Sequence, residues 1–279
     1  MEAKFTICKN CGSQFHGNYC NECGEKVYTD KDKKISHIFE EAFHFITHLD
    51  GKFFTTLKLF FTKPGFVSKE YSEGKRKKYF KPVSLFLIAV VVYLLFPLLQ
   101  GMNISFGSHL VNNNEMHIYY SKELALHKME KHHLSEQQLA EKFDHTSPKF
   151  AKILLLVMLP LTALTLSLIF KRKKKFFFDH FILATELNTI FIFIFFLILP
   201  LAILLLSLII NRNIEIGDYL YYSIIQIVLF FIIVITAFRR FYAVSFRTAF
   251  STSLLFLLGY FIALFIYRQI VFLLVMLFI

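Results

Sequence analysis

The sequence lacks the short motifs by which several enzyme classes are recognised. It has no glycine-rich phosphate loop, no G-x-S-x-G nucleophile elbow, no H-E-x-x-H metal-binding pair and no dinucleotide-binding fingerprint. Tryptophan is absent, and the only cysteines are four within the first 23 residues. A disulfide framework is therefore excluded for everything that follows them. Since no nucleophile or acid–base set stands out, we expect a protein that is not an enzyme.

The four cysteines form two C-x-x-C pairs, and a glycine follows each pair. Each tight turn can direct two thiolates at one ion, so two such turns close a tetrahedral four-thiolate site. With all four positions filled, the pattern is typical of a structural zinc ribbon in a reducing compartment. The alternative is a redox or iron site of the rubredoxin type, for which the eight-residue gap between the pairs is short. The predicted ligands of structural zinc are Cys8, Cys11, Cys20 and Cys23.

Long apolar runs follow the cysteines. Hydrophobic residues make up 56% of the chain, which is above the share found in soluble domains. Runs of this length are typical of transmembrane helices. We therefore predict an all-α integral membrane protein with about five transmembrane helices and a small N-terminal four-cysteine zinc ribbon. The predicted spans are Val83–Leu99, Ala151–Phe170, Leu187–Ile210, Tyr219–Phe238 and Ala249–Tyr267.

Three predicted domains follow from the alternation of polar and apolar stretches. Residues 1–28 form the zinc ribbon, and residues 29–82 form cytosolic amphipathic or interfacial helices with a basic collar. Residues 83–279 form the five-span membrane domain. Within it, residues 100–149 are polar and histidine-rich, so we expect an external loop, in which a solvated helix starts at a capping box from Ser135 to Gln138.

The net charge of +11 suggests nucleic acid as a partner, but the basic residues lie beside the apolar runs. Segment 171–180 has five Lys or Arg and 239–248 has three, whereas 211–218 has one beside two acidic residues. Because basic loops stay in the cytosol, this predicts a multi-pass protein of the cytoplasmic (inner) membrane, with its N-terminus cytosolic and its C-terminus external. The expected partners are the lipid bilayer, with anionic headgroups at the basic collar, and a cytosolic protein bound through the ribbon. Nucleic acid is not expected.

A second group of polar residues precedes the membrane domain. On a helix, Glu40, His44 and His48 share one face, and Glu41 and His44 have the spacing of a carboxylate–histidine metal pair. The later spans offer no second E-x-x-H pair to complete a two-metal site. We interpret these residues as the polar face of an interfacial helix. A metal site formed by His44, His48 and Asp50 is the alternative.

Several residues in the predicted spans favour a different function. Pro160 and Pro200 interrupt the second and third spans, where each removes a backbone hydrogen bond and predicts a kink. Glu186 opens the third span, and we expect it at the membrane interface beside the basic loop. Gln226 lies within the fourth span. Together they motivate the alternative of a small transporter or permease.

A longer string of motifs follows the ribbon: His44-x-x-x-His48-x-Asp50-Gly51, then Pro64-Gly65, then Glu70-Tyr71-x-x-Gly74-Lys75-Arg76-x-x-Tyr79-x-x-Pro82. From residue 8 to about residue 90, the chain resembles a family of bacterial zinc-ribbon membrane proteins classed as a domain of unknown function. The resemblance implies an architecture and no activity. We therefore predict a membrane protein of unknown activity, a non-enzymatic scaffold or interaction platform with a structural zinc site.

Overall fold

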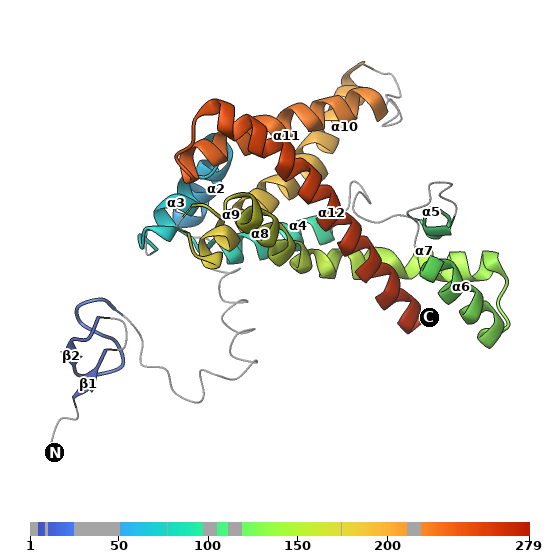
Figure 1. The fold of residues 1–279 in the computed structure, drawn as a ribbon, viewed down its shortest axis with the longest axis horizontal. Helices are drawn as coiled ribbons and strands as arrows, with labels where there is room; N and C mark the ends of the chain where they lie inside the picture. Colours follow the sequence, from blue (N-terminus) through green and yellow to red (C-terminus); the bar gives the residue numbers. More distant parts are fainter. Residues whose placement is uncertain are drawn as a thin grey trace. The chain divides into compact units, whose positions relative to one another are not determined.

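Two compact units divide the chain, Met1–Leu49 and Asp50–Ile279. The computed structural model describes residues 5–8, 11–24, 51–76, 78–96, 105–110, 119–173, 175–210 and 219–279 (Figure 1). The predicted domain boundary at residue 28 lies outside these residues. So does the predicted surface helix with Glu40, Glu41, His44, His48 and Asp50. A second metal site there stays a prediction.

The first unit contains a small antiparallel hairpin. Strand β1, Thr6–Ile7, pairs with β2, Gln14–Phe15. Cys8 follows β1 directly and packs with Phe15 and Cys20 in a small buried cluster. A unit of this size gains little free energy from burial, so a bound metal would supply most of its folding free energy.

The second unit consists of helices and connecting turns in all of its described residues. This agrees with the predicted all-α membrane domain. The helices are α2 (Gly51–Thr62), α3 (Phe66–Ser72), α4 (Pro82–Leu95), α5 (Phe106–Leu110), α6 (Tyr119–His132), α7 (Glu136–Ile153), η1 (Leu154–Val157), α8 (Met158–Ile169), α9 (Phe177–Phe191), η2 (Ile192–Ile198), α10 (Leu199–Ile210), α11 (Tyr219–Phe241) and α12 (Phe246–Phe278).

Four helical stretches are long and apolar enough to cross a membrane, namely Glu136–Ile169, Phe177–Leu206, Ile224–Phe241 and Phe246–Phe278. They correspond to the second to fifth predicted spans. The first predicted span, Val83–Leu99, corresponds to α4, which has 14 residues and ends at Leu95. Fourteen residues rise about 21 Å, against a hydrocarbon core of about 30 Å. By length, the described helices support four crossings and not the five predicted.

Non-α turns precede Pro160 and Pro200, the prolines inside the second and third predicted spans. The 3-10 segment η1 comes before Pro160, and the π-helical segment η2 comes before Pro200. Proline has no N–H to donate to the carbonyl four residues earlier, and that carbonyl belongs to Leu156 in η1 and to Phe196 in η2. The disturbance predicted at each proline is found as a change of helix type.

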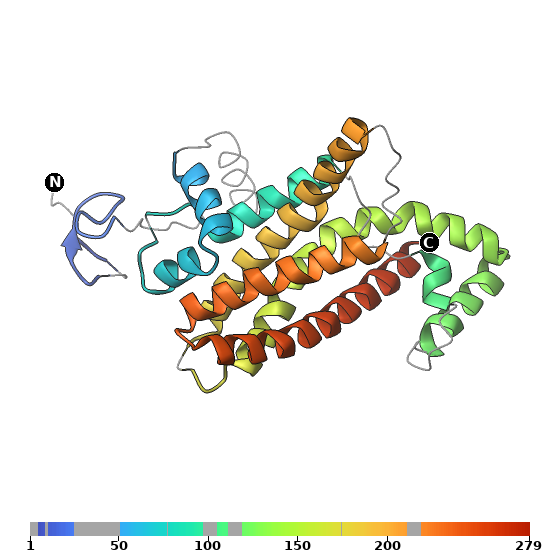
Figure 2. The ribbon, with the colours of Figure 1, turned by 90° about the horizontal axis from the view of Figure 1, so that it is seen from above.

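The two ends of the long helices carry different smaller elements. Helices α2 and α3 pack where α9 begins and α11 ends, whereas α5, α6 and the start of α7 lie at the far end, beside the end of α12 (Figure 2). Helices α8, α9, α11 and α12 run side by side between these ends. Helix α4 begins after α2 and α3 at one end of the long helices and leads toward the far end. This direction bears on the number of membrane crossings.

The far end is less solvated than the sequence predicts for residues 100–149. The capping box at the start of α7 is confirmed, since Gln138 Oε1 accepts from the Ser135 N–H at 2.9 Å and Ser135 Oγ from the Gln138 N–H at 3.3 Å. However, α7 then buries Phe143 completely, and its ring centroid lies 5.5 Å from that of Phe272 in α12. Helix α12 therefore continues well beyond the predicted span Ala249–Tyr267 and supports this end through its last turns.

The turn between α2 and α3 depends on Gly65. Its φ is +79°, and a Cβ at this position would lie 2.6 Å from the Ala237 carbonyl oxygen of α11. Both the backbone conformation and the lack of space therefore require glycine. Gly74, after α3, has a φ of +96° but no atom within 4 Å of where its Cβ would be.

We predict that Gly65→Ala destabilises the protein more than Gly74→Ala. Both changes force alanine into a left-handed conformation, at a cost of about 1–2 kcal/mol. Only Gly65→Ala places a methyl group against the α11 backbone, which adds about 1–3 kcal/mol. Thermal unfolding in detergent should show the larger drop in midpoint for Gly65→Ala. Equal drops would mean that α3 does not pack on α11 as described.

Candidate functional site

The four predicted metal ligands converge in the first unit. Their Sγ atoms all lie within 4.8 Å of one another. The Sγ atoms of Cys8 and Cys23 are 3.5 Å apart, as are those of Cys11 and Cys20, so the two C-x-x-C turns face each other. With zinc–sulfur bonds of about 2.3 Å, tetrahedral geometry places the sulfurs about 3.8 Å apart. The arrangement fits one ion held by four thiolates.

The two C-x-x-C turns have the same backbone geometry. The Gly12 N–H donates to the Cys8 carbonyl at 2.9 Å, and the Gly24 N–H donates to the Cys20 carbonyl at 2.8 Å. Both glycines have a positive φ, 75° and 68°. This conformation favours glycine, which explains why one follows each cysteine pair.

Ser13 is the residue of this site that the spacing of the cysteines does not reveal. Its Oγ lies 2.8 Å from Cys11 Sγ and 3.2 Å from Cys20 Sγ. The hydrogen bond between Ser13 and Cys20, together with one from the Cys23 backbone N–H, lowers the pKa of the Cys20 thiol to about 6, although burial acts in the opposite direction. Thiolate is the form that binds metal, so Ser13 favours the charge state that the site needs.

The second unit contains a buried carboxylate where α9 meets the start of α3. Glu186 of α9 is fully buried, whereas the sequence predicts an interfacial position beside the basic loop. Its carboxylate accepts hydrogen bonds from the Gly65 N–H at 2.7 Å and the Ser68 N–H at 2.9 Å, and also from the Ser68 hydroxyl. These N–H groups have no partner within α3, because they belong to its first turn. We call these three hydrogen bonds the docking contact.

Two further contacts hold the same turn. The Arg240 guanidinium of α11 donates to the Pro64 carbonyl at 3.1 Å, and the Ser68 hydroxyl also approaches the Ile182 carbonyl at 3.2 Å. The start of α3 is thus bound by α9 on one side and by α11 on the other. A buried carboxylate is tolerated when hydrogen-bond donors surround it, and this turn supplies them.

The residues after α3 fix the turn that leads to α4. Glu70 accepts from Lys75 Nζ at 2.7 Å and from the Tyr79 hydroxyl at 3.3 Å. The hydrogen bond from Lys75 lowers the pKa of the Glu70 carboxyl, and the same pair raises the pKa of Lys75. Further along, Thr56 Oγ1 of α2 accepts from the Phe80 N–H at 3.0 Å. The turn between α3 and α4 is therefore hydrogen-bonded to α3 and to α2.

An aromatic contact connects this segment to the start of α9. The Arg76 guanidinium lies over the rings of Tyr71 and Phe178, at 5.5 and 4.9 Å from their centroids. The two rings are stacked at 6.5 Å. Residues of the motif from Glu70 to Pro82 thus have structural partners, and Pro82 is the first residue of α4, one residue before the predicted start of the span.

Buried polar side chains form hydrogen bonds between the long helices. The Asn188 amide nitrogen donates to Thr162 Oγ1 at 3.1 Å and to the Ala184 carbonyl at 2.8 Å, and its oxygen accepts from the Tyr260 hydroxyl at 3.2 Å. These bonds connect α8, α9 and α12. The hydroxyl of Tyr242 lies 2.7 Å from His180 Nδ1. Such bonds satisfy buried polar groups and specify the packing of the helices.

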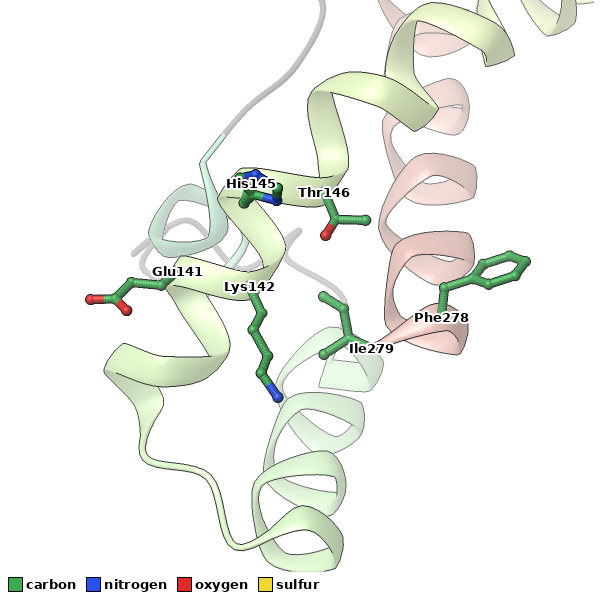
Figure 3. A pocket seen from close by; sticks show the side chains of 6 residues that line it. All are labelled: Glu141, Lys142, His145, Thr146, Phe278 and Ile279. Atoms are coloured by element: carbon green, nitrogen blue, oxygen red, sulfur yellow. The ribbon is translucent and has the colours of Figure 1, made fainter.

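One open pocket of about 450 Å³ lies at the far end, between α7 and the last residues of α12 (Figure 3). Glu141 and Lys142 line it together with His145 and Ile279. Its charges are of both signs, and Glu141 and Lys142 are exposed, so it shows no preference for a particular ligand. Among the described residues, the four cysteines are the only group with the composition and spacing of a metal site.

Comparison with known proteins adds one match. Residues 50–94 match a family described as "Protein of unknown function (DUF3667)". The matched segment covers α2, α3 and α4 as far as Leu94. It fits an uncharacterised family, as expected, but the four-cysteine ribbon lies outside the match. No curated protein and no solved structure matches the chain.

We predict that the full-length protein binds one zinc ion per chain and loses it in the Cys20→Ser variant. Removing one of four thiolates opens the coordination sphere and lowers metal affinity strongly. Elemental analysis of both proteins after dialysis measures the stoichiometry, with Ser13→Ala as a control that keeps all four sulfurs. Iron in the wild type, or zinc retained by Cys20→Ser, would contradict a four-thiolate zinc site.

Proposed function

We propose that this chain is a non-enzymatic integral membrane protein that serves as a cytosolic interaction platform with a structural zinc ribbon. The observation that carries the proposal is the docking contact. It fixes the family-matched segment on the membrane helices through buried hydrogen bonds to Glu186. A segment held in this way loses little conformational freedom when a partner binds. It is therefore suited to an interaction platform that also carries the ribbon, which precedes it in the sequence.

The connectivity of the second unit supports a fifth crossing by α4. The elements before α4 pack at one end of the long helices, and those after it pack at the other end (Figure 2). If the four long helices cross the bilayer, the chain has to cross it once more between these two ends. A 14-residue helix can do so where the bilayer thins locally.

The distribution of charge supports a cytosolic position for the end that carries α2 and α3. Lys171, Arg172 and Lys173 are exposed there, between α8 and α9, and Arg239 lies there at the end of α11. Since basic loops are retained in the cytosol, we place the N-terminus in the cytosol and the C-terminus outside the cytoplasmic (inner) membrane.

Structural zinc and a protein partner complete the proposal. Four thiolates leave no open coordination position for a substrate, which favours a structural role. The ribbon also exposes Phe5, Ile7 and Tyr19, by 65%, 63% and 58%. Exposed apolar side chains on so small a unit favour a protein partner over nucleic acid, which basic faces bind.

Proximity labelling from the N-terminus of the full-length protein tests the platform. We expect a specific set of labelled cytosolic proteins that is lost in a Phe5→Ser, Ile7→Ser variant, because this variant removes exposed apolar groups and keeps all four cysteines. Zinc content and membrane level of the variant serve as controls. A labelled set that does not depend on these residues would contradict the platform.

A small transporter is the second candidate. The π-helical segment η2 lies in the same long helix as buried Asn188, and π-helical turns are frequent at functional sites. Against it, Asn188 is bonded to Thr162 and Tyr260 within the protein, so its polar groups already have partners. A labelled set independent of the ribbon would favour the transporter.

A further inference from the structure

An apolar groove of about 500 Å³ lies on the outside of the helical bundle, between α8 and α12. Its walls include Leu164 and Leu168 from α8 and Leu258 and Ile262 from α12, and each of these side chains is more than half exposed. Both helices belong to stretches long enough to cross a membrane. If these helices cross the bilayer as proposed above, the groove faces its hydrocarbon region.

The floor of the groove is made of small residues. Gly259 lies so close to the Thr165 methyl group that a Cβ on the glycine would overlap with it, and Ala263 follows one turn later. The Thr165 hydroxyl donates to the Leu161 carbonyl of its own helix at 3.0 Å. The small residues let α8 and α12 approach each other closely. The floor offers no unsatisfied hydroxyl to a ligand, so its apolar surface suits a methylene chain.

One end of the groove leads into a basic turn. Ile169 lines the groove, and Lys171, Arg172 and Lys173 follow it with exposed side chains. Phe170 between them is buried and stacked on Tyr242 at 3.6 Å, which fixes where the turn leaves α8. Within the described part of the chain, no carboxylate forms an ion pair with these three residues.

We propose that this groove binds one acyl chain of an anionic phospholipid, with its phosphate against the basic turn formed by Lys171, Arg172 and Lys173. The groove supplies a site for the chain, and the turn supplies positive charge at the level where the headgroup emerges. The inference rests on the membrane placement proposed above, and it names the lipid class and the site.

A second copy of the chain is a less suitable occupant of the groove. Two copies inserted in the same direction and joined through this face would bring their basic turns to the same membrane surface and close together. Like charges brought together at an interface oppose association. An anionic lipid compensates the same charges.

Native mass spectrometry of the full-length protein, equilibrated in detergent with equal amounts of phosphatidylglycerol and phosphatidylcholine, tests the proposal. We expect the wild type to retain phosphatidylglycerol with a preference of at least roughly tenfold, since each Lys or Arg near an anionic headgroup contributes a factor of up to about five and the turn has three of them. The Lys171→Gln, Arg172→Gln, Lys173→Gln variant should show no preference. The control Lys122→Gln, Lys131→Gln, Lys142→Gln loses equal charge at the far end and should keep it.

A second variant tests the groove itself. Leu164→Trp with Leu258→Trp fills it from positions that are 51% and 61% exposed, and should abolish retention of the lipid. Leu205→Trp with Leu208→Trp, on exposed positions of α10 outside the groove, should not. Unchanged preference in the glutamine variant would overturn the proposal, even if the tryptophan variant failed to fold. The proposal would also be overturned if the wild type were a dimer that Leu164→Trp with Leu258→Trp converts to a monomer, because a second copy of the chain would then fill the groove. Ribbon-dependent labelling is measured separately, so either proposal can fail alone.

Discussion

The buried carboxylate of Glu186 is the constraint on which the arrangement of the second unit depends. A carboxylate without exposure to solvent is costly unless donors surround it, and here the first turn of α3 supplies two N–H groups and one hydroxyl. The requirement is mutual, because the first N–H groups of a helix also need acceptors. Glu186 of α9 therefore gains hydrogen-bond donors, and the N–H groups at the start of α3 gain an acceptor.

This contact explains how the short helix α3 is kept on the long apolar helices. Helix α3 has only seven residues and would not be stable alone. Gly65 lets it approach the backbone of α11, and Arg240 binds the preceding carbonyl of Pro64. The family match ends within α4, but the partners that hold the matched segment lie in α9 and α11. The family pattern thus covers one side of an interface, and the membrane helices supply the other.

Local patterns in the sequence predicted the features that depend on near neighbours. The turns of the two cysteine pairs and the capping box at Ser135 both reflect contacts within a few residues. The docking contact has no such signal, because Ser68 and Glu186 are 118 residues apart. The first predicted span was too long because hydropathy continues past Leu95, whereas Phe96 leaves the helical conformation directly before Pro97, where helical geometry is disfavoured.

Hydrogen exchange at the amides of Gly65 and Ser68 tests the docking contact most directly, with the full-length protein in lipid nanodiscs and detection by mass spectrometry. We expect peptides covering these amides to exchange as slowly as the core of α9. The exposed turn at Gly74 and Lys75, whose amides bond only to carbonyls of the last turn of α3, should exchange faster. Glu186→Ala should release the protection at Gly65 and Ser68 and leave α8 and α12 protected. Fast exchange at Gly65 and Ser68 in the wild type would contradict the account.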